Sequence, residues 1–286
     1  MKAKEYPVSV FQALKLSMLP ARKLREVSRN NLPVIVSLTS IPSRIHKIHL
    51  TIRSILAQTR QPEKIILWLH EDMKGTLPKS LTQLESEVFR ICFSPLTCSH
   101  KKLVHTLQQY PDKIVITCDD DFMYSADWVR LLYQEHLKYP ENIIGNQTRY
   151  IRYDREGKLL SYTSWTYPDQ GPIDPDKILP IGAEGVLYPP DCLYKEVNNT
   201  DLFLKLSPKA DDLWFKCMSL LRGTVSRQAG NPPRKAVPVI GTQSVSLKKE
   251  NIRKDKNREQ WQTLTDYFDI ELYHKTNAPE NARRDQ

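Results

Sequence analysis

Short apolar runs alternate with stretches of helical periodicity between residues 34 and 139, and this alternation limits the fold more than any other feature of the chain. The predicted strands cover 34–39, 64–69, 88–93 and 114–118, and the predicted helices cover 45–58, 81–87, 101–109 and 125–139. Strands that are each followed by a helix pair in parallel through right-handed crossovers. We therefore predict an α/β fold with a mainly parallel sheet flanked by helices.

The pattern changes after residue 145. Residues 150–167 are predicted to form a hairpin, and the Pro/Gly-rich stretch 168–190 is predicted to be mostly loop. Helices are predicted to begin near residues 210 and 257. The chain thus divides into a basic N-terminal arm (1–30), an α/β half (31–145), a mixed second half of the same domain (146–247) and a basic helical tail (248–286).

Three consecutive carboxylates, Asp119, Asp120 and Asp121, follow the fourth predicted strand. Alternate side chains of an extended chain point to the same side, so we expect Asp119 and Asp121 to face one ligand. Carboxylate oxygens suit Mg²⁺ or Mn²⁺, and ligands of open α/β sheets bind beyond the carboxyl ends of the strands. We predict a cation site at Asp119 and Asp121 that receives a phosphate-bearing ligand. The structural alternative is a solvated acidic turn that caps the next helix.

Other polar side chains are expected at the same edge of the sheet. A loop after the first strand offers hydroxyls and a guanidinium to phosphate, an acid after the second strand can accept from a nucleoside, and a lysine pair can neutralise a diphosphate. These residues are Thr39, Ser40, Arg44, Glu71, Lys101 and Lys102. The loop could also be a mere helix cap and the lysines a solvated pair, and the acid after the second strand is a weak signal by itself.

A glycine-containing turn in the second half, with Gly182, Glu184 and Gly185, is a candidate floor for an acceptor pocket. Glycines allow a ligand to approach the backbone closely, although glycine turns are common.

A second acidic pair, Asp211 and Asp212, begins a predicted helix. Capping and the helix dipole explain acids at this position without any function. In the functional interpretation, one of the two is a general base and Trp214 stacks on a sugar ring.

The net charge of +9 is concentrated in two segments: residues 1–30 carry +5 and residues 248–258 carry +4. An enzyme of nucleic acids would carry a basic stripe through its working face, so we expect no nucleic-acid partner. Phe11, Leu14 and Met18 fall on one helical face of the N-terminal arm, which is typical of helices that lie on membranes. We predict an anionic membrane surface as a partner, with a solvated arm as the alternative.

The composition favours an intracellular location. No run reaches the roughly 18 to 20 apolar residues of a membrane-spanning helix, and no signal-like block opens the chain. Five scattered cysteines suit reduced thiols better than a disulfide framework or a zinc site. We expect a cytoplasmic protein that is peripheral at the inner face of the membrane.

These segments, in this order, resemble bacterial GT-A-fold (Rossmann-like) glycosyltransferases close to family 2, of the surface-polysaccharide type. The resemblance covers about residues 33–221. It rests on Ser-Leu-Thr-Ser-x-Pro-x-Arg after the first strand, Asp-x-Asp after the fourth, the glycine-containing segment and the later Asp-Asp-x-Trp. Residues 68–72 depart from the family, because they stand in place of its usual Asp-Asp-Gly-Ser.

The resemblance implies an enzyme of the EC 2.4 type that uses a nucleotide-sugar donor, UDP-linked, and a glycan or lipid-linked saccharide acceptor. The half 31–145 would bind the donor, which Asp119 and Asp120 would contact, with Mn²⁺ or Mg²⁺ held by Asp119 and Asp121. The half 146–247 would bind the acceptor. Asp212 would be the base, with Asp211 as helix cap. One base and one displacement would give inversion.

Two other functions remain open at the level of the sequence. A metal-dependent phosphodiesterase or nuclease could use the same Asp cluster, although the region around the carboxylates is not basic overall. A catalytically silent nucleotide-sugar-binding homologue is the other alternative. The presence of both acidic clusters argues against it.

Overall fold

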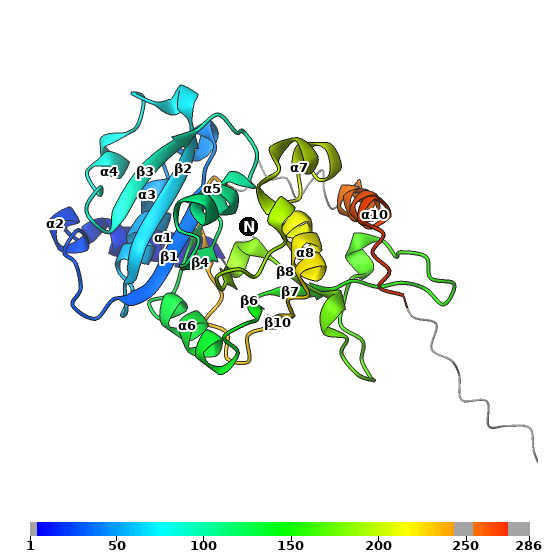
Figure 1. Cartoon of the computed structure of the whole chain (residues 1–286). Coiled ribbons are helices and arrows are strands. Elements are labelled where there is room, and N and C mark those ends of the chain that lie inside the picture. The colour runs from blue at the N-terminus through cyan, green and yellow to red at the C-terminus, as the bar shows by residue number, and fades with distance from the viewer. Residues whose placement is uncertain (1–4, 243–253, 274–286) are drawn as a thin grey trace, which may run out of the picture.

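A seven-stranded sheet runs through the computed structural model, which describes residues 5–242 and 254–273 (Figure 1). The strand order is β10-β6-β9-β4-β1-β2-β3. All neighbours are parallel except the two pairs that β9 makes with β4 and β6. The strands are β1 (Leu32–Thr39), β2 (Pro62–His70), β3 (Phe89–Ser94), β4 (Ile114–Thr117), β6 (Ile143–Gly145), β9 (Val186–Tyr188) and β10 (Ser226–Gln228).

Helices cover both faces of this sheet. On one face α3 and α6 pack with Val34 and Val36 of β1, and on the other α5 and α8 pack with Val115 of β4. The helices are α3 (Ile48–Leu56), α5 (Lys101–Gln109), α6 (Trp128–Lys138), α8 (Asp211–Arg222) and α10 (Lys256–Phe268). Burial on both faces explains why β1 is a continuous apolar run rather than an alternating one.

Shorter elements complete the described part of the chain. Two small antiparallel pairs join β5 (Phe122–Met123) to β11 (Val237–Pro238), and β7 (Thr148–Tyr150) to β8 (Ile178–Pro180). The remaining α-helices are α1 (Glu5–Met18), α2 (Ala21–Leu24), α4 (Lys79–Thr82) and α7 (Thr200–Leu206). Single 3-10 turns lie at Pro42–Arg44, Glu71–Met73, Tyr162–Ser164, Pro175–Lys177, Gly182–Glu184 and Lys195–Asn198.

The predicted fold class is confirmed: the structure is mixed α/β, with a mainly parallel central sheet between helices. The four predicted strands and the helix 101–109 are present as β1 to β4 and α5. The helix predicted at 45–58 is shorter, because a 3-10 turn precedes α3. These elements could be predicted because the strands are continuous apolar runs buried on both faces and the helices have a clear helical period.

The second half differs from the prediction. The stretch 168–190 was expected to be mostly loop, yet it contains β8 and β9, and β9 lies inside the main sheet. β7 pairs with β8, and of these two strands only Tyr150 falls within the predicted hairpin. Inside the hairpin, Tyr153 and Leu159 form an isolated bridge. Three-residue strands beside prolines and glycines are too short to show a period, so tertiary packing decides them.

The sheet takes strands from both predicted halves of the domain. The predicted tail contributes α10, whose Trp261 and Leu264 are buried in the same hydrophobic cluster as residues of α8. Residues 243–253 and 274–286 lie outside the described part of the chain, as do Lys2 and Lys4 of the basic arm. None of the helices that the structure describes has the length and apolar content needed to span a bilayer.

Gly185 fixes the entry into β9. Its φ is +104°, and a Cβ added there would lie 2.6 to 2.9 Å from ring atoms of the buried Trp128. The Trp128 indole donates to the carbonyl of Glu184 at 2.7 Å, and this hydrogen bond fixes the glycine turn against the tryptophan ring.

We expect Gly185→Ala to lower the free energy of unfolding by roughly 3 kcal/mol or more, because it adds backbone strain to overpacking. Gly223→Ala is the matched control, since Gly223 also has a positive φ (+79°) but has no atom within 4 Å of the added Cβ. It should lose roughly 1 to 2 kcal/mol from strain alone. Urea denaturation measures both, and equal losses would contradict the role of Trp128.

Candidate functional site

The candidate site lies at the carboxyl ends of β1 and β4. The chain proceeds from β1 to β2 and β3 on one side, whereas β4 lies on the other side of β1. A crevice forms where the strand order reverses, and ligands of open α/β sheets bind there. The loop after β1 and the three aspartates after β4 therefore meet at this point.

Asp120 anchors the two loops to each other. Its buried carboxylate accepts from the Ser40 hydroxyl and pairs with the Arg44 guanidinium. Thr51 of α3 donates to the Asp120 carbonyl at 2.8 Å. Burial raises the pKa of Asp120, and Arg44 opposes that shift. Asp120, predicted to contact the donor, is thus engaged within the protein together with Ser40 and Arg44.

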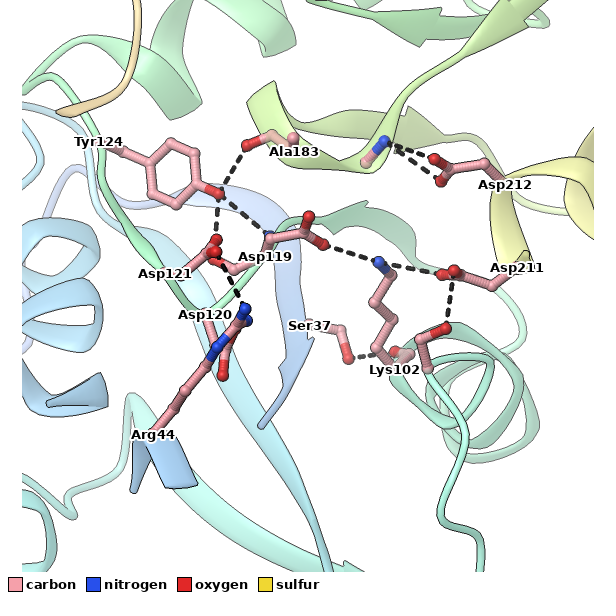
Figure 2. A network of polar contacts seen from close by, with 12 residues as sticks. Ser37, Arg44, Lys102, Asp119, Asp120, Asp121, Tyr124, Ala183, Asp211 and Asp212 are labelled. Carbon is pink, nitrogen blue, oxygen red and sulfur yellow. Dashed lines mark hydrogen bonds and ion pairs between the residues drawn. The ribbon is translucent and has the colours of Figure 1, made fainter. Parts of the chain in front are cut away.

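Asp119 and Asp121 contact different cations. Asp119 Oδ1 lies 3.1 Å from Lys102 Nζ, whereas Asp121 Oδ2 lies 3.3 Å from Arg44 Nη2 (Figure 2). The expectation that both face one side is therefore wrong for this conformation. The chain turns at Asp120 and Asp121 before β5, so the alternation of an extended strand does not continue through the three residues.

Lys102 lies between the two predicted acidic clusters. Its Nζ is 3.1 Å from Asp119 and 3.0 Å from Asp211 Oδ2, and its side chain is 4% exposed (Figure 2). Burial alone lowers the pKa of Lys102, but Asp119, Asp211 and Asp212 outweigh it and hold this pKa well above its ordinary value. Lys102 is therefore a permanent ammonium ion that connects the end of β4 to the start of α8.

Asp211 is the partner of Lys102 on α8. Its Oδ1 accepts from the Ser99 hydroxyl at 2.7 Å, and the opposing effects of burial and the Lys102 charge leave its pKa lowered. The start of α8 has no side-chain capping bond. The prediction that Asp211 caps this helix is therefore wrong, because its carboxylate turns towards Lys102 and Ser99 instead.

Asp212 is held by the backbone of the glycine turn. Both of its carboxylate oxygens accept from the Gly182 amide at 3.2 Å. A Cβ at Gly182 would lie 3.1 Å from Asp212 Oδ1 and Lys102 Nζ, and 3.6 Å from Asp119 Oδ1. Desolvation, followed by the charge of Asp211, raises the pKa of Asp212 to about 8. Gly182 therefore leaves room for three ionisable side chains to gather around its α-carbon.

Tyr124 was absent from the predicted set. Its hydroxyl accepts from the Asp119 amide at 3.1 Å and lies 3.0 Å from the Ala183 carbonyl, to which it donates (Figure 2). Desolvation raises the pKa of Tyr124 well above its ordinary value, so it stays protonated. Tyr124 ties Asp119 to the glycine turn. Apart from its closeness in sequence to Asp119, no pattern in the chain indicates this role.

Two predicted site residues belong to the core instead. Trp214 is fully buried, donates to the Val197 carbonyl at 3.0 Å and packs against Phe203, so it cannot stack on a sugar. Lys101 is 2% exposed and donates to the Leu96 carbonyl at 3.0 Å. Both predictions are wrong for the same reason: successive residues of a helix are rotated by about 100°, so a residue next to or two positions from a site residue can point into the core.

The remaining predicted residues have local partners. Thr39 donates to the Trp68 carbonyl at 2.8 Å, and Glu71 is exposed in the 3-10 turn after β2. The Glu184 carboxylate accepts from the Ala236 amide at 3.0 Å. The α-carbon of Gly185 lies against the Trp128 ring, so the missing side chain makes room for this packing and not for a ligand. Of the predicted acceptor floor, Gly182 is the residue that the structure brings to Asp119, Lys102 and Asp212.

The site offers few preformed ligands for a metal. Within residues 5–242 and 254–273, no three His, Cys, Asp or Glu side chains gather as a cage. Asp119 has a 39% exposed side chain, in contrast to Asp121 at 9%. Mg²⁺ typically takes one or two carboxylates and completes its shell with water and substrate phosphates. The donor set fits such a cation, with Asp119 as the more accessible ligand.

Comparisons with known proteins leave the family open. No protein-family model matches the chain, and no curated protein is similar to it in sequence. Among solved structures, the chain is similar to the crystal structure of 4-diphosphocytidyl-2C-methyl-D-erythritol synthase from Anaerococcus prevotii DSM 20548. The TM-score is 0.47 and the identity 12%, over 79% of this chain and 95% of that chain. The function is therefore inferred from the geometry of the site together with the motif resemblance described for the sequence.

We expect Lys102→Met to lower the free energy of unfolding by roughly 3 to 5 kcal/mol, because it leaves Asp119 and Asp211 without their shared cation. Lys101→Met is the matched control: this lysine is equally buried but gives up only a hydrogen bond to a carbonyl, which is worth about 1 to 3 kcal/mol. Urea denaturation at neutral pH measures both.

Adding Asp211→Asn to Lys102→Met should restore part of the stability, because it removes one of the charges left unpaired. Equal losses in the two single variants would show that the ion pairs of Lys102 contribute nothing beyond its burial.

Proposed function

We propose that this chain is a GT-A-type glycosyltransferase that moves a sugar from a UDP-linked donor to a glycan or lipid-linked saccharide acceptor, in surface-polysaccharide synthesis. The observation that carries the proposal is the contact of Lys102 with both Asp119 and Asp211. Glycosyl transfer needs a charged group at the departing diphosphate and a base at the incoming hydroxyl. The structure holds candidates for both around Gly182.

The balance of charge at the site supports dependence on a divalent cation. At neutral pH four carboxylates, from Asp119, Asp120, Asp121 and Asp211, face two cations, Arg44 and Lys102, while Asp212 ionises only as the pH approaches about 8. A diphosphate would be repelled by this excess of acid. Mn²⁺ or Mg²⁺ at Asp119, with Asp121 as second ligand after release from Arg44, would offset most of this negative charge and supply positive charge for the leaving group.

On the donor side, Lys102 supplies a fixed positive charge. Its ammonium is held in place by two carboxylates, so little reorganisation is needed when charge develops on the leaving diphosphate. Tyr124 holds the backbone of Asp119 and thereby the position of its carboxylate.

On the acceptor side, Asp212 has the properties of a general base. The Gly182 amide orients its carboxylate, and a pKa of about 8 brings its titration close to neutral pH, where proton transfer is most efficient. A single base acting with a direct displacement predicts inversion at the sugar.

A phosphodiesterase or nuclease is less well supported. Such enzymes follow a charged backbone with a track of free cations. Arg44 and Lys102, the cations at this site, are both paired with carboxylates.

Donor binding should require a divalent cation. In a thermal-shift and calorimetric panel of UDP-, GDP-, CMP- and dTDP-sugars, we expect the UDP-sugars to bind with Mn²⁺ and to lose affinity by about tenfold or more in EDTA. Asp119→Asn and Asp121→Asn should weaken binding similarly. Asp127→Asn, which alters an exposed acid paired with Arg130, should leave it unchanged. Equal donor affinity in EDTA would overturn the cation site.

Asp212→Asn should lower kcat by roughly 10² to 10⁴ and leave donor affinity nearly unchanged. Release of UDP from the donor, with acceptor or with water, provides the assay. For the wild type, kcat/KM should rise as the pH approaches about 8, because a base acts only when ionised, and this rise should be absent in the variant. Wild-type turnover in Asp212→Asn would mean that the base lies elsewhere.

A further inference from the structure

Helix α1 presents a broad apolar face to solvent. Its exposed hydrophobic side chains, which we call the apolar face, are Tyr6, Val8, Val10, Phe11, Leu14 and Met18, with exposures between 46% and 76%. They are half of the twelve large hydrophobic residues that are exposed in the described part of the chain. Exposed apolar residues scattered singly need no explanation, but a contiguous group on one element marks an interaction site.

The opposite side of α1 is held firmly on the protein body. Ser9 is fully buried and donates to the Pro238 carbonyl at 2.6 Å, and Leu16 packs with Met123 and Val239. Arg53 of α3 donates to the carbonyls of Leu16 and Leu19 at the end of the helix, at 3.1 and 2.7 Å. The apolar face therefore belongs to a helix that is already packed on the protein, and no other described segment covers this face.

Exposed cations lie on α1 and in the segment that follows it. Lys15 lies on α1 itself, and Arg22, Lys23 and Arg25 follow on and just after α2. Residues 1–30 as a whole carry +5. In Figure 1, α2 lies at the left edge of the molecule, on the side opposite to α10, and α1 runs beside the sheet towards it.

We propose that α1 and α2 form a surface that docks on an anionic membrane, with Phe11, Leu14 and Met18 inserted at the level of the headgroups. Apolar residues flanked by lysines and arginines are the composition of helices that lie in the membrane interface, where lipid charge attracts the cations. A second copy of the chain fits less well, because a two-fold contact would bring like charges together. This inference does not depend on the proposed function.

Vesicle sedimentation of the full-length protein tests the proposal. The wild type should bind vesicles that contain phosphatidylglycerol, bind phosphatidylcholine vesicles weakly and lose binding as salt rises. The triple variant Phe11→Gln/Leu14→Gln/Met18→Gln should bind about tenfold less or worse, with an unchanged melting temperature because these side chains are exposed.

The matched control replaces three exposed hydrophobic residues elsewhere, as Leu137→Gln/Leu204→Gln/Tyr267→Gln, and should bind like the wild type. Failure of the wild type to bind anionic vesicles, or equal binding by the α1 variant, overturns the proposal. Self-association in size-exclusion chromatography that the α1 variant abolishes, without vesicle binding, would assign the face to a second copy and also overturn it.

Discussion

The ion pairs of Lys102 with Asp119 and Asp211 are the interaction on which the arrangement of the site depends. A buried ion pair is weak evidence for stability, because desolvation offsets much of its attraction. Its effect here is positional: one ammonium group joins the end of β4 to the start of α8. Without the Lys102 ammonium, Asp119 and Asp211 would repel each other, and no ion pair would hold the end of β4 to the start of α8 at this point.

The antiparallel strand β9 explains how the glycine turn reaches that ion pair. Thr117, at the end of β4, lies opposite Val186, at the start of β9. Since the strands run in opposite directions, the turn that precedes β9 lies at the carboxyl end of β4. Gly182 therefore meets Asp119 and Asp212, and Tyr124 closes the arrangement with its hydrogen bonds to Asp119 and Ala183. A parallel β9 would have placed this turn at the opposite edge of the sheet.

The sequence identified several of the charged residues of the site, but it did not show which residues they contact. Asp119, Lys102 and Asp212 were predicted from strand ends and helix starts, and the structure brings all three to Gly182. The sequence alone does not distinguish Lys101 from Lys102. The two side chains are rotated by about 100° on α5, so Lys101 contacts the Leu96 carbonyl and Lys102 contacts Asp119. Neighbouring positions on a helix can be told apart only when the packing of that helix is known.

By itself, the sequence determined the α/β class and the four parallel strands β1 to β4, because long apolar runs and helical periods are local properties of the chain. It also determined the charge of the N-terminal arm and the position of Phe11, Leu14 and Met18 on one side of its helix. Only the tertiary structure decided that β8 and β9 are strands, that Trp214 is a core residue, and that Asp119 and Asp121 turn to different cations. These outcomes depend on contacts between segments far apart in the chain, and such contacts leave no periodic signal in either segment.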